Sequence, residues 1–156
     1  MKPSLLAAAL VCMAATGSPA QTTSPYIAEI KRYYYEAVKR NLSAMVEKMP
    51  EEHFAFKPVP EMRSFGEAVA HVADAQARNC NLASGAGSKT LDADKKRTKA
   101  ELQTALKESF AICDGVFAGL TDAQANEMVK MGQSGFQLSK LSLLVSMISH
   151  SNEQHG

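Results

Sequence analysis

The feature that most constrains this chain is the spacing of its apolar residues. Between Tyr26 and Met49 they recur every three or four positions, at Ile27, Ile30, Tyr34, Val38, Leu42, Met45 and Met49. This spacing places them on one face of a long helix. Pro50 ends the helix because proline lacks the backbone N–H that the next helical hydrogen bond needs. A stripe of this kind must be buried against other elements, so the sequence predicts a packed helical domain.

Capping boxes mark three further helix starts. In each box a Ser or Thr is followed three residues later by Glu or Gln, so that the two side chains satisfy free backbone N–H groups. The boxes begin at Ser64, Thr98 and Thr121. They predict helices over 64–83 and 98–119, one or two turns after 121 and, beyond two glycines, a last helix over 138–155. No segment alternates like a strand, so we predict an all-α fold, a bundle of four main helices.

Two irregular connections join these helices. Residues 51–62 contain Pro58 and Pro60 and are predicted to be extended and packed on the end of the bundle. Residues 84–97 are rich in Gly, Ser, Asp and Lys without apolar periodicity, which predicts a solvated loop. This loop is long for a hairpin, so we expect it to cross from one end of the bundle to the other after the second helix.

The N-terminus has the features of a secretory signal. Lys2 precedes an apolar run over 5–15, and Ser18-Pro19-Ala20 forms a small-x-small cleavage site. We therefore predict a signal peptide over 1–20, a bundle domain over 21–156, and export to the periplasm or the medium. The run is too short for a stable membrane span. Because the last helix is still apolar and periodic at Ile148, we expect the natural protein to continue beyond Gly156.

Charge and cysteine content narrow the function classes. The chain has 17 basic and 16 acidic residues, and removal of Lys2 with the signal leaves equal numbers. A neutral domain gives poor support for nucleic-acid binding, which needs a cationic face. Cys80 and Cys113 remain in the mature chain, outside any Cys-x-x-Cys unit. They either form one disulfide after export or are two buried small hydrophobes.

Two of the histidines are predicted to lie on helix faces that point inward. His71 lies among Ala68, Val72 and Ala75, and His150 follows Leu143 and Met147 on one row of the last helix. Neutral imidazole is a common ligand for zinc, nickel or iron, and bundles build metal sites from facing helices. The alternative is that each is a partly buried histidine hydrogen-bonded to a neighbour.

Further polar residues flank these two. Gln154 lies one turn beyond His150 on the same face, whereas His155 is turned away by about 140°. Gln154 is thus the third inward group, although an amide oxygen is a weak ligand for these metals. Asp74, one turn after His71, is placed either to orient that ring or to face water beside Arg78. We expect His53 to lie at the surface or the end of the bundle.

These residues occur in a familiar pattern. The stretch 48–75, with Met49-Pro50-Glu51-Glu52-His53-Phe54, Ser64-Phe65-Gly66-Glu67 and His71-Val72-Ala73-Asp74-Ala75, resembles the DinB family, and so does Ser149-His150-Ser151-Asn152-Glu153-Gln154. The resemblance implies a four-helix bundle that holds a divalent metal ion through three histidines. His71 and His150 match two of the ligands, and Gln154 occupies the third position.

The family that the sequence resembles includes metal-dependent thiol transferases. The resemblance therefore implies either a thiol transferase or hydrolase-like enzyme acting on a small-molecule thiol or other small ligand, or a non-catalytic bundle that binds a metal or small ligand. In an enzyme the metal would act as a Lewis acid that activates a bound thiol. The sequence is also compatible with a homodimer.

Overall fold

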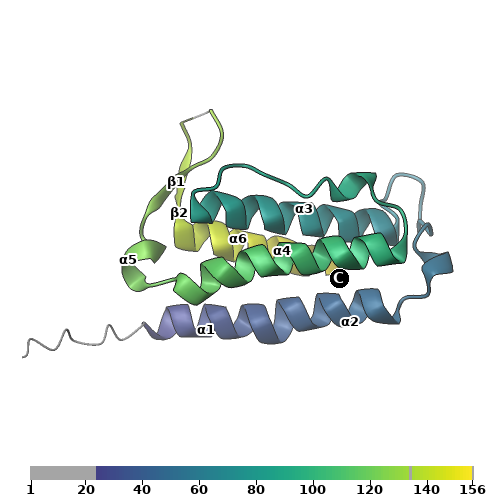
Figure 1. Ribbon diagram of the computed structural model, residues 1–156, viewed down its shortest axis with the longest axis horizontal. Helices are drawn as coiled ribbons and strands as arrows, with labels where there is room; N and C mark the ends of the chain where they lie inside the picture. Colours follow the sequence, from purple (N-terminus) through teal and green to yellow (C-terminus); the bar gives the residue numbers. More distant parts are fainter. Residues whose placement is uncertain (1–23, 134, 156) are drawn as a thin grey trace, which may run out of the picture.

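The computed structural model describes residues 24–133 and 135–155, so the predicted signal peptide lies outside the described residues. Among the described residues, four long helical segments form a bundle (Figure 1), which confirms the predicted fold class. The first segment comprises α1 (Pro25–Tyr33), a π-helical turn η1 (Tyr34–Lys39) and α2 (Arg40–Lys48). The others are α3 (Phe65–Ser84), α4 (Lys99–Gly119) and α6 (Lys140–His155).

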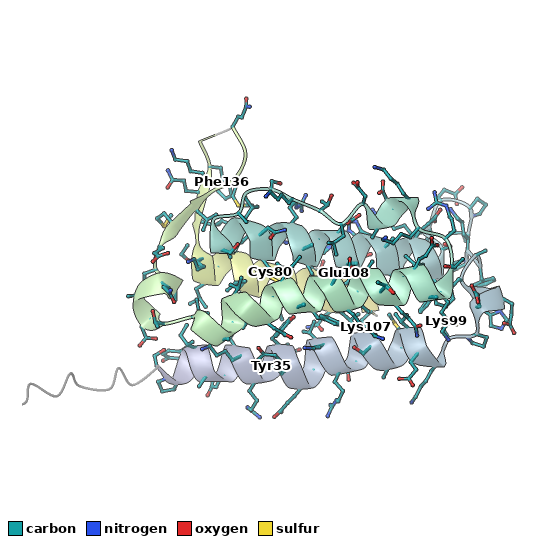
Figure 2. All side chains as sticks on the ribbon, viewed as in Figure 1. Tyr35, Cys80, Lys99, Lys107, Glu108 and Phe136 are labelled. Atoms are coloured by element: carbon teal, nitrogen blue, oxygen red, sulfur yellow. A yellow bond between two sulfur atoms is a disulfide. The ribbon has the colours of Figure 1, made fainter. Side chains whose placement is uncertain are left out.

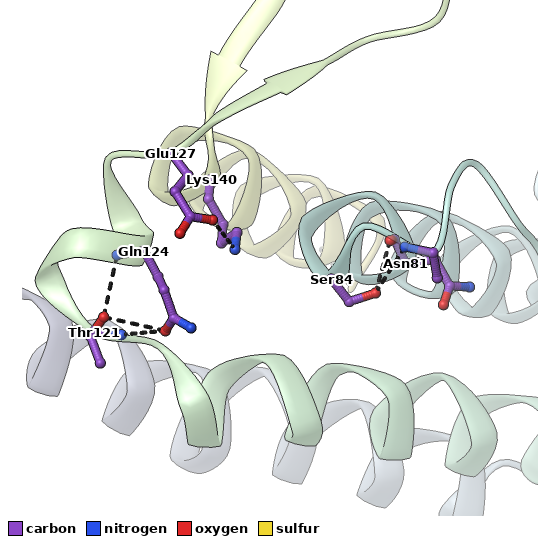
Figure 3. A network of polar contacts seen from close by, with 7 residues as sticks. Asn81, Ser84, Thr121, Gln124, Glu127 and Lys140 are labelled. Atoms are coloured by element: carbon purple, nitrogen blue, oxygen red, sulfur yellow. Dashed lines mark hydrogen bonds and ion pairs between the residues drawn. The ribbon is translucent and has the colours of Figure 1, made fainter.

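The predicted capping boxes fix where three helices begin. Ser64, Thr98 and Thr121 each accept a hydrogen bond from the backbone N–H three residues on, and the side chain at that position accepts one from the backbone N–H of the cap residue. Thr121 opens the short helix α5 (Asp122–Ala125), where the Gln124 side chain accepts from the Thr121 N–H at 3.0 Å (Figure 3). Each box satisfies N–H groups that a helix start otherwise leaves unpaired.

The loop between α3 and α4 crosses the bundle from one end to the other, as predicted. It returns alongside α3, so that α4 runs in the same direction as α3 (Figure 1). One helical turn of it forms η3 (Ala93–Lys95). The Asp74 carboxylate of α3 accepts from the backbone N–H groups of Leu91, Ala93 and Asp94 at 2.8, 3.1 and 3.3 Å. Asp74 therefore holds the crossover loop against α3.

The connection over 50–64 packs on the end of the bundle through one aromatic residue. It starts with a helical turn, η2 (Glu51–His53), and Phe54 then enters the core, where its ring meets Phe65 edge-on at 5.0 Å between centroids. The Gly66 N–H donates to the Phe54 carbonyl at 2.9 Å. A Cβ on Gly66 would come within 3.1 Å of that same oxygen, a contact tight enough to favour glycine here.

The region before α6 differs from the prediction. Two strands, β1 (Met128–Lys130) and β2 (Gln137–Ser139), pair antiparallel with Val129 opposite Leu138, although the sequence predicted none. The hairpin projects beyond the bundle and carries Phe136 (Figure 2). Strands of three residues are too short to show alternation. The predicted helix start at Leu138 is therefore wrong: Leu138 and Ser139 belong to β2, and α6 begins at Lys140.

The core lies where the four segments meet. Small side chains on α3 are fully or almost fully buried, which lets its neighbours approach closely; they include Ala70, Ala73 and Ala77. Cys80 of α3 and Cys113 of α4, both without exposed surface, form a disulfide with their Cα atoms 5.1 Å apart. This resolves the two alternatives left by the sequence in favour of the disulfide. No helix among the described residues is long and apolar enough to cross a membrane.

Candidate functional site

Two imidazoles from different helices meet on one side of the bundle. The Nε2 atoms of His71 on α3 and His150 on α6 are 2.9 Å apart, and the rings cross edge-to-face with their centroids 4.9 Å apart. The Ser64 cap sets the start of α3 and places His71 about two turns into the helix. At this distance one Nε2 donates its proton to the lone pair of the other, so at least one ring of the hydrogen-bonded pair is neutral.

The surroundings of His71 favour its neutral form. Both rings are half-buried. Burial is the largest effect and lowers the pKa of His71 below its usual value. The nearby groups Arg63, His150 and Arg78 lower this pKa further, with effects that decrease in that order, whereas Asp74 raises it. A neutral imidazole keeps a lone pair on one ring nitrogen, which is the state that binds a metal.

Gln154 and His71 line different cavities. Gln154 is half-buried on α6 and lines a cavity of about 290 Å³ between α2, α3 and α6, together with His155. His71 lines a different cavity, of about 920 Å³, formed by the connection over 50–64, the start of α3 and the crossover loop. The structure therefore brings His71 and His150 together and places Gln154 on the wall of the smaller cavity. Among the described residues, no three His, Cys, Asp or Glu side chains are grouped to hold an ion.

The other polar residues considered from the sequence have separate places. Asp74 binds the crossover loop through three backbone N–H groups, so its carboxylate anchors that loop instead of facing open water. His53 is exposed and lines an apolar cavity of about 560 Å³ at the end of the bundle. Arg63 lines both this cavity and the one beside His71, and the sequence did not indicate it as a candidate functional residue. It lies in an exposed, irregular segment where no local pattern marks it.

The histidine pair thus lies between two helices of a capped four-helix bundle with a crossover loop. A family model described as the DinB superfamily matches residues 34–156. The chain therefore belongs to the DinB superfamily.

Solved structures agree on the fold. The crystal structure of a DinB-like protein, YjoA from Bacillus subtilis, determined at 2.30 Å resolution, superposes with a TM-score of 0.64. The match covers 81% of this chain and 84% of that chain at 16% sequence identity, so it bears on the fold alone. No curated protein sequence matches the chain.

Proposed function

We propose that this DinB-superfamily protein is exported and binds a divalent metal ion, zinc, nickel or iron, through His71 and His150, with Gln154 as the third ligand. The observation that carries the proposal is the 2.9 Å approach of the two Nε2 atoms across α3 and α6. A tetrahedral ion bound at 2.0–2.1 Å needs ligand nitrogens about 3.3 Å apart. The observed separation is only slightly shorter, so small ring movements would admit the ion.

The donor set also fits such a metal. Two imidazoles are good ligands for zinc, nickel and iron, whereas the amide oxygen of Gln154 is a weak third one. Gln154 follows His150 by one turn on α6 and would complete the set from the same helix. The described parts of the chain place no third His, Cys, Asp or Glu at the pair, so we expect weak binding with coordination positions left open for small molecules.

An enzymatic role follows from the same site. A divalent metal supplies Lewis acidity, which lowers the pKa of a thiol or water beside it. The cavity of about 920 Å³ next to His71 falls within the usual size of small-molecule sites. These features support a thiol transferase or hydrolase-like enzyme. The residues of this chain would supply two parts: His71 and His150 hold the ion, and the cavity walls hold the substrate.

The metal proposal is tested with untagged protein. Titration with the metal in competition with a chromophoric chelator should saturate at about one ion per chain. His71→Ala and His150→Ala should lose it while the far-UV circular dichroism stays helical, and Gln154→His should bind at least about tenfold more tightly because imidazole replaces an amide. His155→Ala is the matched control on the same helix and should bind as the wild type does. A Gln154→His variant without gain in affinity contradicts the proposal.

A second candidate rests on the same contact. His71 and His150 already satisfy one another by a hydrogen bond, so the pair could serve only to join α3 and α6 in a non-catalytic, ligand-binding bundle. In that case His71→Gln, which keeps a polar end at this place, should remain nearly as stable as the wild type, and no variant should take up metal. Metal at full occupancy in the wild type rules this candidate out.

Export is supported by the disulfide. Cys80 and Cys113 are paired inside the bundle, and such bonds persist in oxidising compartments. Expressed in a bacterium that exports proteins, the chain should be recovered outside the cytoplasm with Gln21 at or near its N-terminus. A variant without residues 2–20 should stay inside. An intact Met1 on protein from the periplasm or the medium contradicts this proposal.

A further inference from the structure

Two neighbouring cavities at the end of the bundle share Arg63 and Ser64. The larger one, about 920 Å³, is lined by His71 and by many charged side chains. The smaller one, about 560 Å³, is walled mainly by apolar residues, among them Phe56, Pro58 and Phe65. Arg63 thus lies between a polar space beside the histidine pair and an apolar space without strong polar partners.

Most charges in the larger cavity are already engaged. Lys57 pairs with Glu67 at 2.8 Å. The Arg97 guanidinium donates to the carbonyls of Asp94 and Lys96, and the carboxylate of Asp74 is taken up by the loop backbone. These groups hold the cavity walls together and have little left for a ligand.

Arg63 differs from them. It is exposed, and its guanidinium makes no hydrogen bond or ion pair to any residue that the structure describes. Its positive charge lowers the pKa of the His71 ring, an effect second in size to that of burial. Glu61 also lines the larger cavity and is not joined to Arg63 in the described part of the chain. The guanidinium is therefore an uncommitted cation within electrostatic reach of the histidine pair.

We propose that Arg63 binds the acidic group of a small organic anion whose apolar body lies against Phe56, Pro58 and Phe65. A guanidinium holds carboxylate, sulfonate or phosphate oxygens in a two-pronged contact that few other side chains can make. An apolar wall with few convergent polar groups is the usual build of a small-molecule site. An amphipathic anion fits both cavities at once, whereas a purely polar or purely apolar molecule uses only one of them.

This inference names the class of ligand for the site beside His71, so it deepens the proposed function and rests on it. The binding step itself needs no metal, so the two can be tested apart. A suitable pair of probes is 8-anilinonaphthalene-1-sulfonate and N-phenyl-1-naphthylamine, which share an aromatic body and differ in the sulfonate. Their fluorescence is titrated against chelator-treated, metal-free protein.

The wild type should bind the sulfonate dye more tightly than the neutral dye. Arg63→Gln should weaken the sulfonate dye by about tenfold or more, because a charge-assisted hydrogen bond is lost, and leave the neutral dye unchanged. Arg78→Gln is the matched control, since Arg78 also carries its charge near His71 but lines neither cavity. It should change neither dye. Phe56→Ser should weaken the binding of both dyes, and Glu61→Gln should not weaken the binding of the sulfonate dye.

Equal losses in Arg63→Gln and Arg78→Gln would show a general charge effect and overturn the inference, and so would sulfonate binding that Arg63→Gln leaves intact. The two proposals fail separately. Protein that takes up metal at His71 but shows no dependence of dye binding on Arg63 overturns the anion site alone. Arg63-dependent dye binding in protein that takes up no metal overturns the metal proposal alone.

Discussion

The disulfide between Cys80 and Cys113 should account for much of the stability of this small bundle. The bond closes a loop across 33 positions of sequence. In the chain-entropy account, a cross-link over that length removes about 12 cal/mol/K from the unfolded chain, or about 4 kcal/mol at 25 °C. Total stabilities are only about 5–15 kcal/mol, so loss of the bond should leave the fold marginal.

Reduction isolates this effect because both sulfur atoms stay in the chain. The protein starting at Gln21, which contains only these two cysteines, is unfolded in urea with and without a phosphine reductant. With a slope of about 2 kcal/mol/M, a loss of about 4 kcal/mol moves the midpoint down by roughly 2 M. Mass spectrometry after alkylation of unreduced, unfolded protein should show no free thiol. A shift below roughly 0.5 M, or two alkylated thiols, refutes the reasoning.

Three other predictions concern single residues. Gly66→Ala should lower the free energy of unfolding by about 1–2 kcal/mol, because the new Cβ would meet the Phe54 carbonyl at 3.1 Å. Gly115→Ala, where the new Cβ has open space around it, should raise the free energy of unfolding by up to about 1 kcal/mol. Urea unfolding measures both. Tyr34→Phe should stabilise the protein by about 1 kcal/mol, because the buried hydroxyl has no hydrogen-bond partner among the described residues. Destabilisation in the same assay would contradict this prediction. Backbone hydrogen bonds from Thr98 and Arg97 lower the pKa of Glu101 to about 2. Its stabilising effect is therefore complete above the ordinary value near 4.3 and is lost as the pH falls through 2. Glu101→Gln should be less stable than the wild type at pH 7, and the difference should shrink as the pH falls from about 4 to 2, as urea unfolding at each pH will show.

Helix starts could be predicted from the sequence because their cause is local. A capping box needs only residues three positions apart, and at Ser64, Thr98 and Thr121 the predicted hydrogen bonds are present. The long stripe of the first segment was also predicted, but not the π-helical turn within it at Tyr34–Lys39. One wider turn shifts the register by a single residue, which a three-and-four pattern absorbs without a visible break.

The hairpin and the role of Asp74 could not be predicted, because their partners are remote. Leu138 continues the apolar pattern of the last helix, yet it pairs with Val129 across two turn glycines with positive φ, so tertiary pairing outweighs local preference. Asp74 binds backbone groups 17 to 20 residues further on, a distance at which no short motif exists. Gln154 as a ligand stays a prediction, as do His71 and His150.

The crossover connects the fold to the candidate site. Because the loop carries the chain back along α3, its η3 turn lies beside the first half of that helix, and Asp74 fixes it there one turn beyond His71. Asp94 and Lys96 of the same loop then form a wall of the cavity that His71 lines. A short hairpin between α3 and α4 would leave this side of His71 open to solvent. The long loop, which at first indicates only a change in topology, thus supplies part of the wall of the space in which a ligand would meet His71.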